Sequence, residues 1–144
     1  MADAIKAQGW TFASHTWGHA LIGNISQERL VRDTEKWDTY VKPLVGDTDI
    51  IIFAHGQDLA EEKNYLSSPK YQYLKSMGFH IFCPVDSTAY TFHINDEFVH
   101  NGRRNLDGYR IWYDAHGLGK RDWTKDLFDA KEVLDPARTD MPPL

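Results

Sequence analysis

Two histidines near the start of the chain have a spacing that suits metal binding. His15 and His19 stand in the segment Ser-His-Thr-Trp-Gly-His, residues 14–19. If this segment makes one helical turn, side chains four residues apart share a face, and both imidazoles can reach one ion. Gly18 permits a tight bend of the backbone, and the Thr16 hydroxyl is able to support a ligand. The same spacing also fits two polar histidines on a surface turn.

A zinc centre needs more than this pair, because a catalytic zinc generally takes three protein ligands and keeps a position for water. Two residues that follow predicted strands are candidates for the third ligand, His55 and Asp86. Each also has a plainer interpretation, since His55 precedes a loop glycine and aspartate is common in turns and at helix N-caps. We interpret the other histidines, which have no partner at a suggestive spacing, as structural or exposed: His80, His93, His100 and His116.

Other chemically capable residues have ordinary interpretations. The run 101–110 is rich in turn formers, and although its arginines suit a carboxylate or sugar hydroxyls, a solvated turn is the simpler expectation. Cys83 is the only cysteine, which excludes an internal disulfide, and it lies in an apolar run where an inert core thiol is expected. The chain has no glycine-rich phosphate loop and no Gly-x-Ser-x-Gly nucleophile elbow.

The candidate ligands depend on an alternation of helices and strands for their positions. Helices are expected at 2–7, from Ser26 to about Pro43 and Gly46, and at 70–77, and strands at 10–13, 49–54 and 79–85. This alternation favours a parallel sheet built from βαβ units, either open or closed into a barrel. In both arrangements functional residues gather at the C-terminal ends of the strands. The candidate ligands all fall at or just after such ends: His15, His19, His55 and Asp86.

The pattern changes after residue 86. Short runs at 90–94 and 109–113 look like strands, and a hairpin is one arrangement of them; a single helix is expected at 126–134 before a proline-rich end. We treat 1–144 as one domain, with an α/β part at 1–90 and an irregular C-terminal extension at 91–144 that contains short strands.

Composition limits the partners. The net charge of −5 without a basic cluster argues against a nucleic-acid or anionic-membrane partner. The apolar runs are too short to cross a bilayer, and the N-terminus has no apolar signal core, so as written nothing directs the chain to export. Aromatic residues make up 13% and include five tryptophans, which agrees with a sugar-binding surface but also with ordinary core packing.

The segment 9–19, Gly-Trp-Thr-Phe-Ala-Ser-His-Thr-Trp-Gly-His, resembles the second motif of the polysaccharide deacetylases, the NodB-homology group of carbohydrate esterase family 4. That motif reads His-[Ser/Thr]-x-x-His, and His15, Thr16 and His19 match it. The order of the following helix, buried strand, glycine-bearing turn and the run 73–79 is also similar, so the resemblance covers roughly residues 1–90.

The resemblance implies a partial, deformed (β/α) barrel that binds a divalent metal, usually zinc, with His15 and His19 as two ligands. It implies hydrolysis of a sugar acetamide in an N-acetylated polysaccharide, with an aspartate as general base and a histidine as general acid. A protein that follows this family works outside the cell or in the cell envelope.

Several motifs of the family have no match in this sequence. The Thr-Phe-Asp-Asp motif is absent, residues 52–56 lack the arginine of the third motif, and no clear Leu-x-His motif follows. We therefore expect the chain to be truncated on its N-terminal side, with its catalytic residues unassigned and no activity on its own. The alternatives are a non-catalytic relative that binds glycan or another partner, and an unrelated α/β domain with a chance histidine pair. A truncated barrel would leave a sheet edge open, so a homo-oligomer that covers this edge is expected.

Overall fold

The computed structural model describes residues 1–85, 91–118, 123–137 and 140. The chain divides into two compact units. The first comprises the described residues up to Arg103, and the second comprises the described residues from Arg104 onward. All the residues of the candidate site lie in the first unit.

The helices of the first unit are α1 (Ala2–Lys6), α2 (Gln27–Tyr40), α3 (Lys42–Val45) and α4 (Pro69–Ser76), with the 3₁₀ turns η1 (Ala54–Gly56) and η2 (Glu62–Ser67). The side chain of Ser26 caps α2 by accepting a hydrogen bond from the Arg29 amide, as predicted. Ser68 caps α4 in the same way, and Pro69 occupies its first turn, where no amide hydrogen is needed. These caps fix where the two longest helices of the unit begin.

The sheet has four strands in the order β1 (Ile50–Ile52), β2 (Ile81–Cys83), β4 (Val99–Asn101) and β3 (Phe92–Ile94). β1, β2 and β4 are parallel, and β3 pairs antiparallel with β4 as an edge strand. The predicted mixed α/β class with parallel strands is confirmed. Within the described ranges the strands form a small open sheet, and no closed barrel is present.

The strand predicted at 10–13 does not form. Trp10 is 68% exposed, and only Ser14 reaches the sheet, where it makes a single parallel bridge to Ile51. The Ser14 amide donates to the Ile50 carbonyl at 2.9 Å, and the Ser14 carbonyl accepts from the Ile52 amide at 2.8 Å. The chain therefore meets the outer edge of β1 at one residue, immediately before His15.

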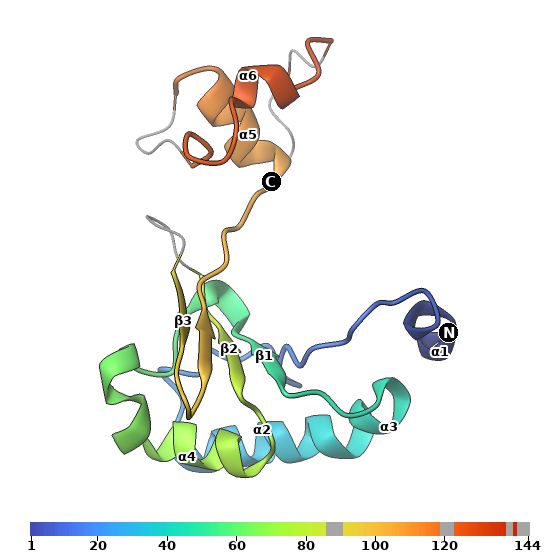
Figure 1. Ribbon diagram of the computed structural model, residues 1–144, viewed down its shortest axis with the longest axis vertical. Coiled ribbons are helices and arrows are strands. Elements are labelled where there is room, and N and C mark those ends of the chain that lie inside the picture. The colour runs from blue at the N-terminus through green and yellow to red at the C-terminus, as the bar shows by residue number, and fades with distance from the viewer. Residues whose placement is uncertain (86–90, 119–122, 138–139, 141–144) are drawn as a thin grey trace. The chain divides into compact units, whose positions relative to one another are not determined.

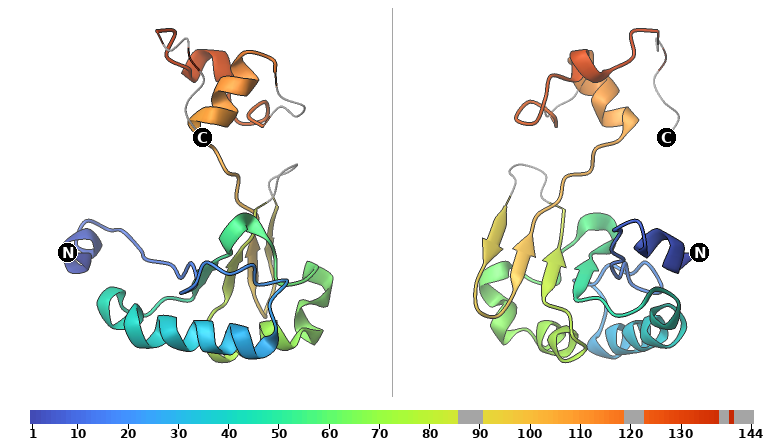
Figure 2. Two further views of the ribbon diagram at one scale, coloured as in Figure 1. Left: turned by 180° about the vertical axis from the view of Figure 1, so that it is seen from behind. Right: turned by 45° about the vertical axis from the view of Figure 1, so that its right-hand side comes forward.

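The core lies between the sheet and the helices α2 and α4, which run side by side in Figures 1 and 2. Its centre is aromatic: Tyr65 and Tyr71 contact Phe82 of β2, and Phe98 packs against all three. Leu30 and Trp37 of α2 are buried in the same cluster. This core fixes the sheet against the helices, and the C-terminal ends of its strands carry polar residues.

The second unit contains α5 (Gly108–Ala115) and α6 (Ala130–Val133). The prediction of a strand at 109–113 is wrong, because this run lies inside α5. Asp107 caps that helix by accepting from the Arg110 amide at 2.8 Å, and the Tyr109 ring contacts the ring of Tyr113, one turn later. The helix expected at 126–134 is reduced to α6. Across the described parts of the chain, no helix combines the length and hydropathy needed to span a membrane.

Candidate functional site

Three histidines from two distant segments come together at the C-terminal edge of the sheet. The ring centroids of His15 and His19 lie 5.0 Å apart, and those of His19 and His55 lie 4.4 Å apart. His15 directly follows the Ser14 bridge, and His55 lies in η1, directly after β1. All three side chains are exposed. The structure thus brings His55 beside the predicted pair, whereas Asp86 lies outside the described residues.

The backbone of this cluster is strained. Among the described residues other than glycine, a positive φ occurs at Thr16 (66°), His19 (50°) and His55 (56°). This conformation places Cβ close to the backbone and costs of order 1–3 kcal/mol per residue, so it persists only where the surrounding structure imposes it. The three strained positions coincide with two of the clustered histidines and the threonine between His15 and His19.

The loop that joins His15 to His19 is held by α2. The Asp33 carboxylate accepts hydrogen bonds from the backbone amides of Trp17 and Gly18, both at 2.8 Å. A side chain at position 18 would place its Cβ 2.9 Å from an Asp33 oxygen, so glycine permits this close approach. A further hydrogen bond lies within the loop, where the Thr16 hydroxyl oxygen accepts from the Ala20 amide at 3.3 Å.

A hydrogen bond to the sheet fixes the tautomer of His15. Its Nδ1 lies 2.7 Å from the Ile52 carbonyl oxygen. Because a carbonyl can only accept, Nδ1 must carry the hydrogen, and in the neutral ring Nε2 is then the unprotonated nitrogen. Metal-ligating histidines commonly donate their other ring N–H in this way, which orients the ring and increases its basicity.

The ring spacing within each contacting pair is close to that of two histidines on one metal ion, although the group of three described residues whose ligand atoms all lie within 4.8 Å of one another is a different one, Glu62, His93 and His100. Two imidazoles bound to one tetrahedral zinc through Zn–N bonds of about 2.0 Å have ring centroids about 5 Å apart. The observed 5.0 Å and 4.4 Å lie close to this value. Imidazole nitrogen is a ligand that zinc prefers, and the exposure of the three rings leaves room for water or a substrate.

Arg103, which follows β4, lies at the same C-terminal ends of the strands. Its guanidinium donates to the Phe53 carbonyl at 2.5 Å and to the Cys83 carbonyl at 3.2 Å, so it joins the ends of β1 and β2. Burial lowers the pKa of Arg103 and raises that of Cys83, whose thiol is buried as predicted. The expectation of a solvated turn is wrong here, because this side chain gives a second hydrogen bond to carbonyls that already accept from the Phe53 and Gly56 amides.

A polar groove lies beside the histidine loop. Its volume is about 430 Å³, and it is lined by Trp17, Gly18, Arg29, Arg32, Asp33 and Lys36. Trp17 is 46% exposed and packs on the ring of Tyr40 at 5.3 Å between centroids. The groove therefore combines an exposed aromatic face with cationic side chains from α2.

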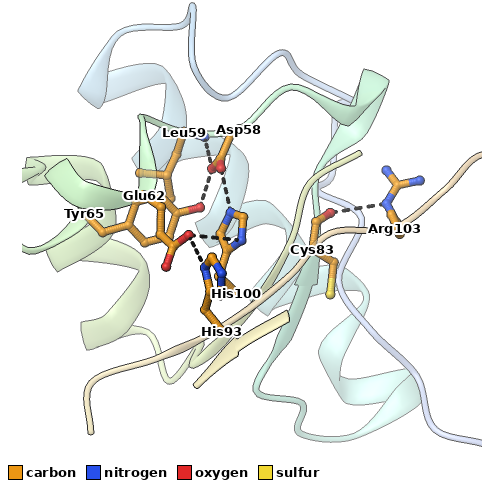
Figure 3. Close-up of polar contacts among 8 residues, drawn as sticks. All are labelled: Asp58, Leu59, Glu62, Tyr65, Cys83, His93, His100 and Arg103. Atoms are coloured by element: carbon orange, nitrogen blue, oxygen red, sulfur yellow. Dashed lines mark hydrogen bonds and ion pairs between the residues drawn. The ribbon is translucent and has the colours of Figure 1, made fainter. Parts of the chain in front are cut away.

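A second group of ligand types lies on the outer strands, and the sequence analysis missed it. Glu62, His93 and His100 each direct one ligand atom to a common point, and these atoms all lie within 4.8 Å of one another (Figure 3). His93 is exposed and His100 is buried, in agreement with their interpretation as structural or exposed residues, but their proximity to each other was missed because spacing along the chain does not show pairing across strands. A sequence signal that could have revealed the group is the short run 92–101, because a hairpin formed by this run places positions 93 and 100 opposite each other.

Comparison of the chain with protein-family models, with curated proteins and with solved structures finds no match. The inference of function therefore depends on the residues and their geometry.

Proposed function

We propose that this chain is a metal-dependent, polysaccharide-deacetylase-like domain in which zinc is bound by His15 and His19, with His55 as the third ligand. The observation that carries the proposal is the contact of the His19 ring with the rings of His15 and His55, together with the hydrogen bond that holds Nδ1 of His15 on the Ile52 carbonyl. The match of residues 15–19 to the deacetylase histidine motif adds the substrate class, an N-acetylated glycan.

In such a site a bound zinc ion supplies a Lewis acid that polarises the acetamide carbonyl and lowers the pKa of a water molecule. The chain's own residues orient the ligands: Ile52 fixes the tautomer of His15, and Asp33 holds the loop between His15 and His19. The strain at His19 and His55 agrees with a functional role, because such strain clusters at active and ligand-binding sites.

The groove next to the histidine loop supports a glycan as the ligand. Trp17 presents an exposed aromatic face, and Tyr40 packs against it and holds it in place. Arginine and lysine side chains along the same groove are donors for sugar hydroxyls or for acidic substituents. A sugar chain bound here would lie beside the three histidines, since Trp17 stands between His15 and His19 in the sequence.

We also propose that the sheet belongs to a deformed (β/α) barrel of the NodB type. The parallel strands β1, β2 and β4, and the parallel bridge at Ser14, support this proposal. The location of the histidine cluster at the C-terminal ends of strands supports it as well, because barrels of this kind carry their active sites there.

Zinc titration followed by calorimetry tests the metal site. The intact chain is compared with His15→Ala, with His19→Ala and with the control His80→Ala, which removes an exposed histidine outside the cluster. We expect each of the first two variants to weaken zinc binding at this site at least tenfold, and the control to bind like the parent. Unchanged zinc uptake at this site in the double variant His15→Ala/His19→Ala would refute the proposal.

The glycan is tested separately with N-acetylglucosamine oligomers. We expect the intact chain to bind these oligomers and Trp17→Ala to bind them at least tenfold more weakly. Because no match to the family's catalytic aspartate motif occurs in the sequence, we expect no release of acetate by this chain alone. Acetate release at a rate normal for a deacetylase would show that the catalytic set is complete.

A further inference from the structure

We propose that Glu62, His93 and His100 form a second zinc site, which shares no residue with the histidine cluster and does not depend on the proposed function. The three ligand atoms come from η2 and from both strands of the β3–β4 hairpin. The site would connect η2 to the outer edge of the sheet.

Strand pairing places the two histidines. In the antiparallel register of β3 and β4, His93 lies directly opposite His100, so both side chains project from the same face of the sheet. Their rings are nearly parallel, with centroids 6.4 Å apart and an interplanar angle of 24°. His100 is buried, with its side chain 9% exposed, whereas the side chain of His93 is 55% exposed. The pair therefore has a fixed inner member and an outer member that can adjust.

Glu62 lies against this pair from η2. Its Oε2 is 2.7 Å from Nδ1 of His93 and 3.7 Å from Nδ1 of His100 (Figure 3). Two ligands of one tetrahedral zinc lie about 3.3 Å apart, so one of these distances is slightly short and the other slightly long. The Glu62 carboxylate accepts the hydrogen of Nδ1 of His93, so entry of the ion displaces this hydrogen as a proton. It also requires a shift of about half an ångström, which the partly exposed side chains of Glu62 and His93 can make.

A partly buried chain of hydrogen bonds orients His100 toward this point. Its Nε2 lies 2.9 Å from an Asp58 oxygen, and because a carboxylate accepts, the hydrogen of the neutral ring belongs on Nε2. Nδ1, the atom that faces Glu62, is then the unprotonated nitrogen. Asp58 is itself held by the Tyr65 hydroxyl and by the Leu59 amide. Burial, with the nearby Asp58 carboxylate, raises the pKa of Tyr65, so this hydroxyl stays a donor.

This arrangement is the carboxylate–histidine–metal pattern, in which an outer carboxylate fixes the tautomer of a ligating histidine. Two imidazoles and one carboxylate form a ligand set that suits zinc better than calcium or magnesium, which prefer oxygen ligands alone. The exposed side of His93 leaves a fourth position for water. Because the site joins η2 to an edge hairpin, zinc bound there stabilises this part of the fold.

The test separates the two sites by stoichiometry, with Zn²⁺ as the probe. Four forms of the full chain are compared after equilibrium dialysis: the parent, His15→Ala/His19→Ala, Glu62→Gln/His93→Asn, and the combination of both pairs. His100 is left unchanged because it is buried, and circular dichroism verifies that each variant folds. His80→Ala serves as the control for loss of a histidine elsewhere on the surface.

We expect two equivalents of zinc in the parent and the control, one in each pair variant and none in the combination. In the His15→Ala/His19→Ala background, zinc should also raise the melting temperature, and this rise should disappear in the combination. Two results would overturn the second site. One is that the His15→Ala/His19→Ala variant retains zinc and adding Glu62→Gln/His93→Asn does not reduce the amount. The other is that the His15→Ala/His19→Ala variant retains no zinc. Retention of only one equivalent by the parent, removed by Glu62→Gln/His93→Asn, instead supports the second site and refutes the first.

Discussion

A single hydrogen bond decides how each key histidine presents itself to a ligand. In His15 the Ile52 carbonyl engages Nδ1 and leaves Nε2 as the lone-pair nitrogen, whereas in His100 Asp58 engages Nε2 and leaves Nδ1. One tie comes from the backbone of β1 and the other from a buried carboxylate. In both cases a group of the chain itself has set the tautomer that a metal requires.

Asp33 should influence the first metal site although it is no ligand. Its carboxylate holds the amides of Trp17 and Gly18, and these residues set the distance between His15 and His19. We expect Asp33→Ala to weaken zinc binding by this histidine pair about 10- to 100-fold, the usual effect of losing an outer-shell contact. Calorimetric titration in the Glu62→Gln/His93→Asn background measures this site alone.

The matched control is Asp38→Ala, which removes the same charge from the same helix. Asp38 forms an ion pair with Lys42 on the protein surface. Its variant should bind zinc like the parent, because a surface ion pair contributes little. Equal weakening by both substitutions would mean that Asp33 acts through its charge and not through the loop amides.

At the scale of elements, local sequence signals predicted α2 and α4 but gave the wrong structure for the segments 109–113 and 10–13. Ser26 and Ser68 cap α2 and α4, and both helices were expected from the sequence. The run 109–113 reads as a strand because it is aromatic and branched, yet the Asp107 cap makes it a helix. The segment 10–13 has strand propensity, but only Ser14 has a neighbouring strand to pair with.

The residues of the two proposed sites also differ in whether the sequence alone could predict them. The pair His15 and His19 was visible because both ligands lie within one motif, and His55 because it follows a strongly predicted strand. The group of Glu62, His93 and His100 was not visible, because it needs the register of β3 on β4 and the placement of η2. Contacts of this kind arise from tertiary packing, which spacing along a single sequence does not encode.

Gly56 should be critical for the turn that carries His55. Its φ is +71°, and a Cβ built there overlaps the Val85 side chain at the end of β2. We expect Gly56→Ala to destabilise the fold by about 2–4 kcal/mol, combining backbone strain with overpacking. Urea denaturation measures the change.

Gly78→Ala is the control for backbone strain alone. Gly78 has a φ of +95°, and nothing lies within 4 Å of the Cβ position. Its variant should lose only about 1–2 kcal/mol. If the two substitutions cost the same, the packing of residue 56 against Val85 does not contribute to the stability of the turn.

At the scale of the whole molecule, the outer edge of the sheet is open to solvent. All three residues of β3 are exposed, among them Phe92 at 49% and Ile94 at 68%. An edge strand offers unpaired amides and carbonyls to another chain, and exposed apolar side chains favour such pairing. This edge lies on the opposite side of the sheet from β1, where the N-terminal truncation was expected to leave strands unpaired, so it is a second place where another chain could pair.

We therefore predict that the protein self-associates through β3 and that Ile94→Lys weakens this association, because a lysine on an edge strand opposes pairing with a second copy. Sedimentation velocity over a range of concentrations measures the effect, and we expect the dissociation constant to rise at least tenfold. Leu44→Lys is the control, since Leu44 is equally exposed, at 69%, but lies in α3. A monomeric parent at all concentrations, or equal effects of the two lysines, would show that β3 is not the surface of association.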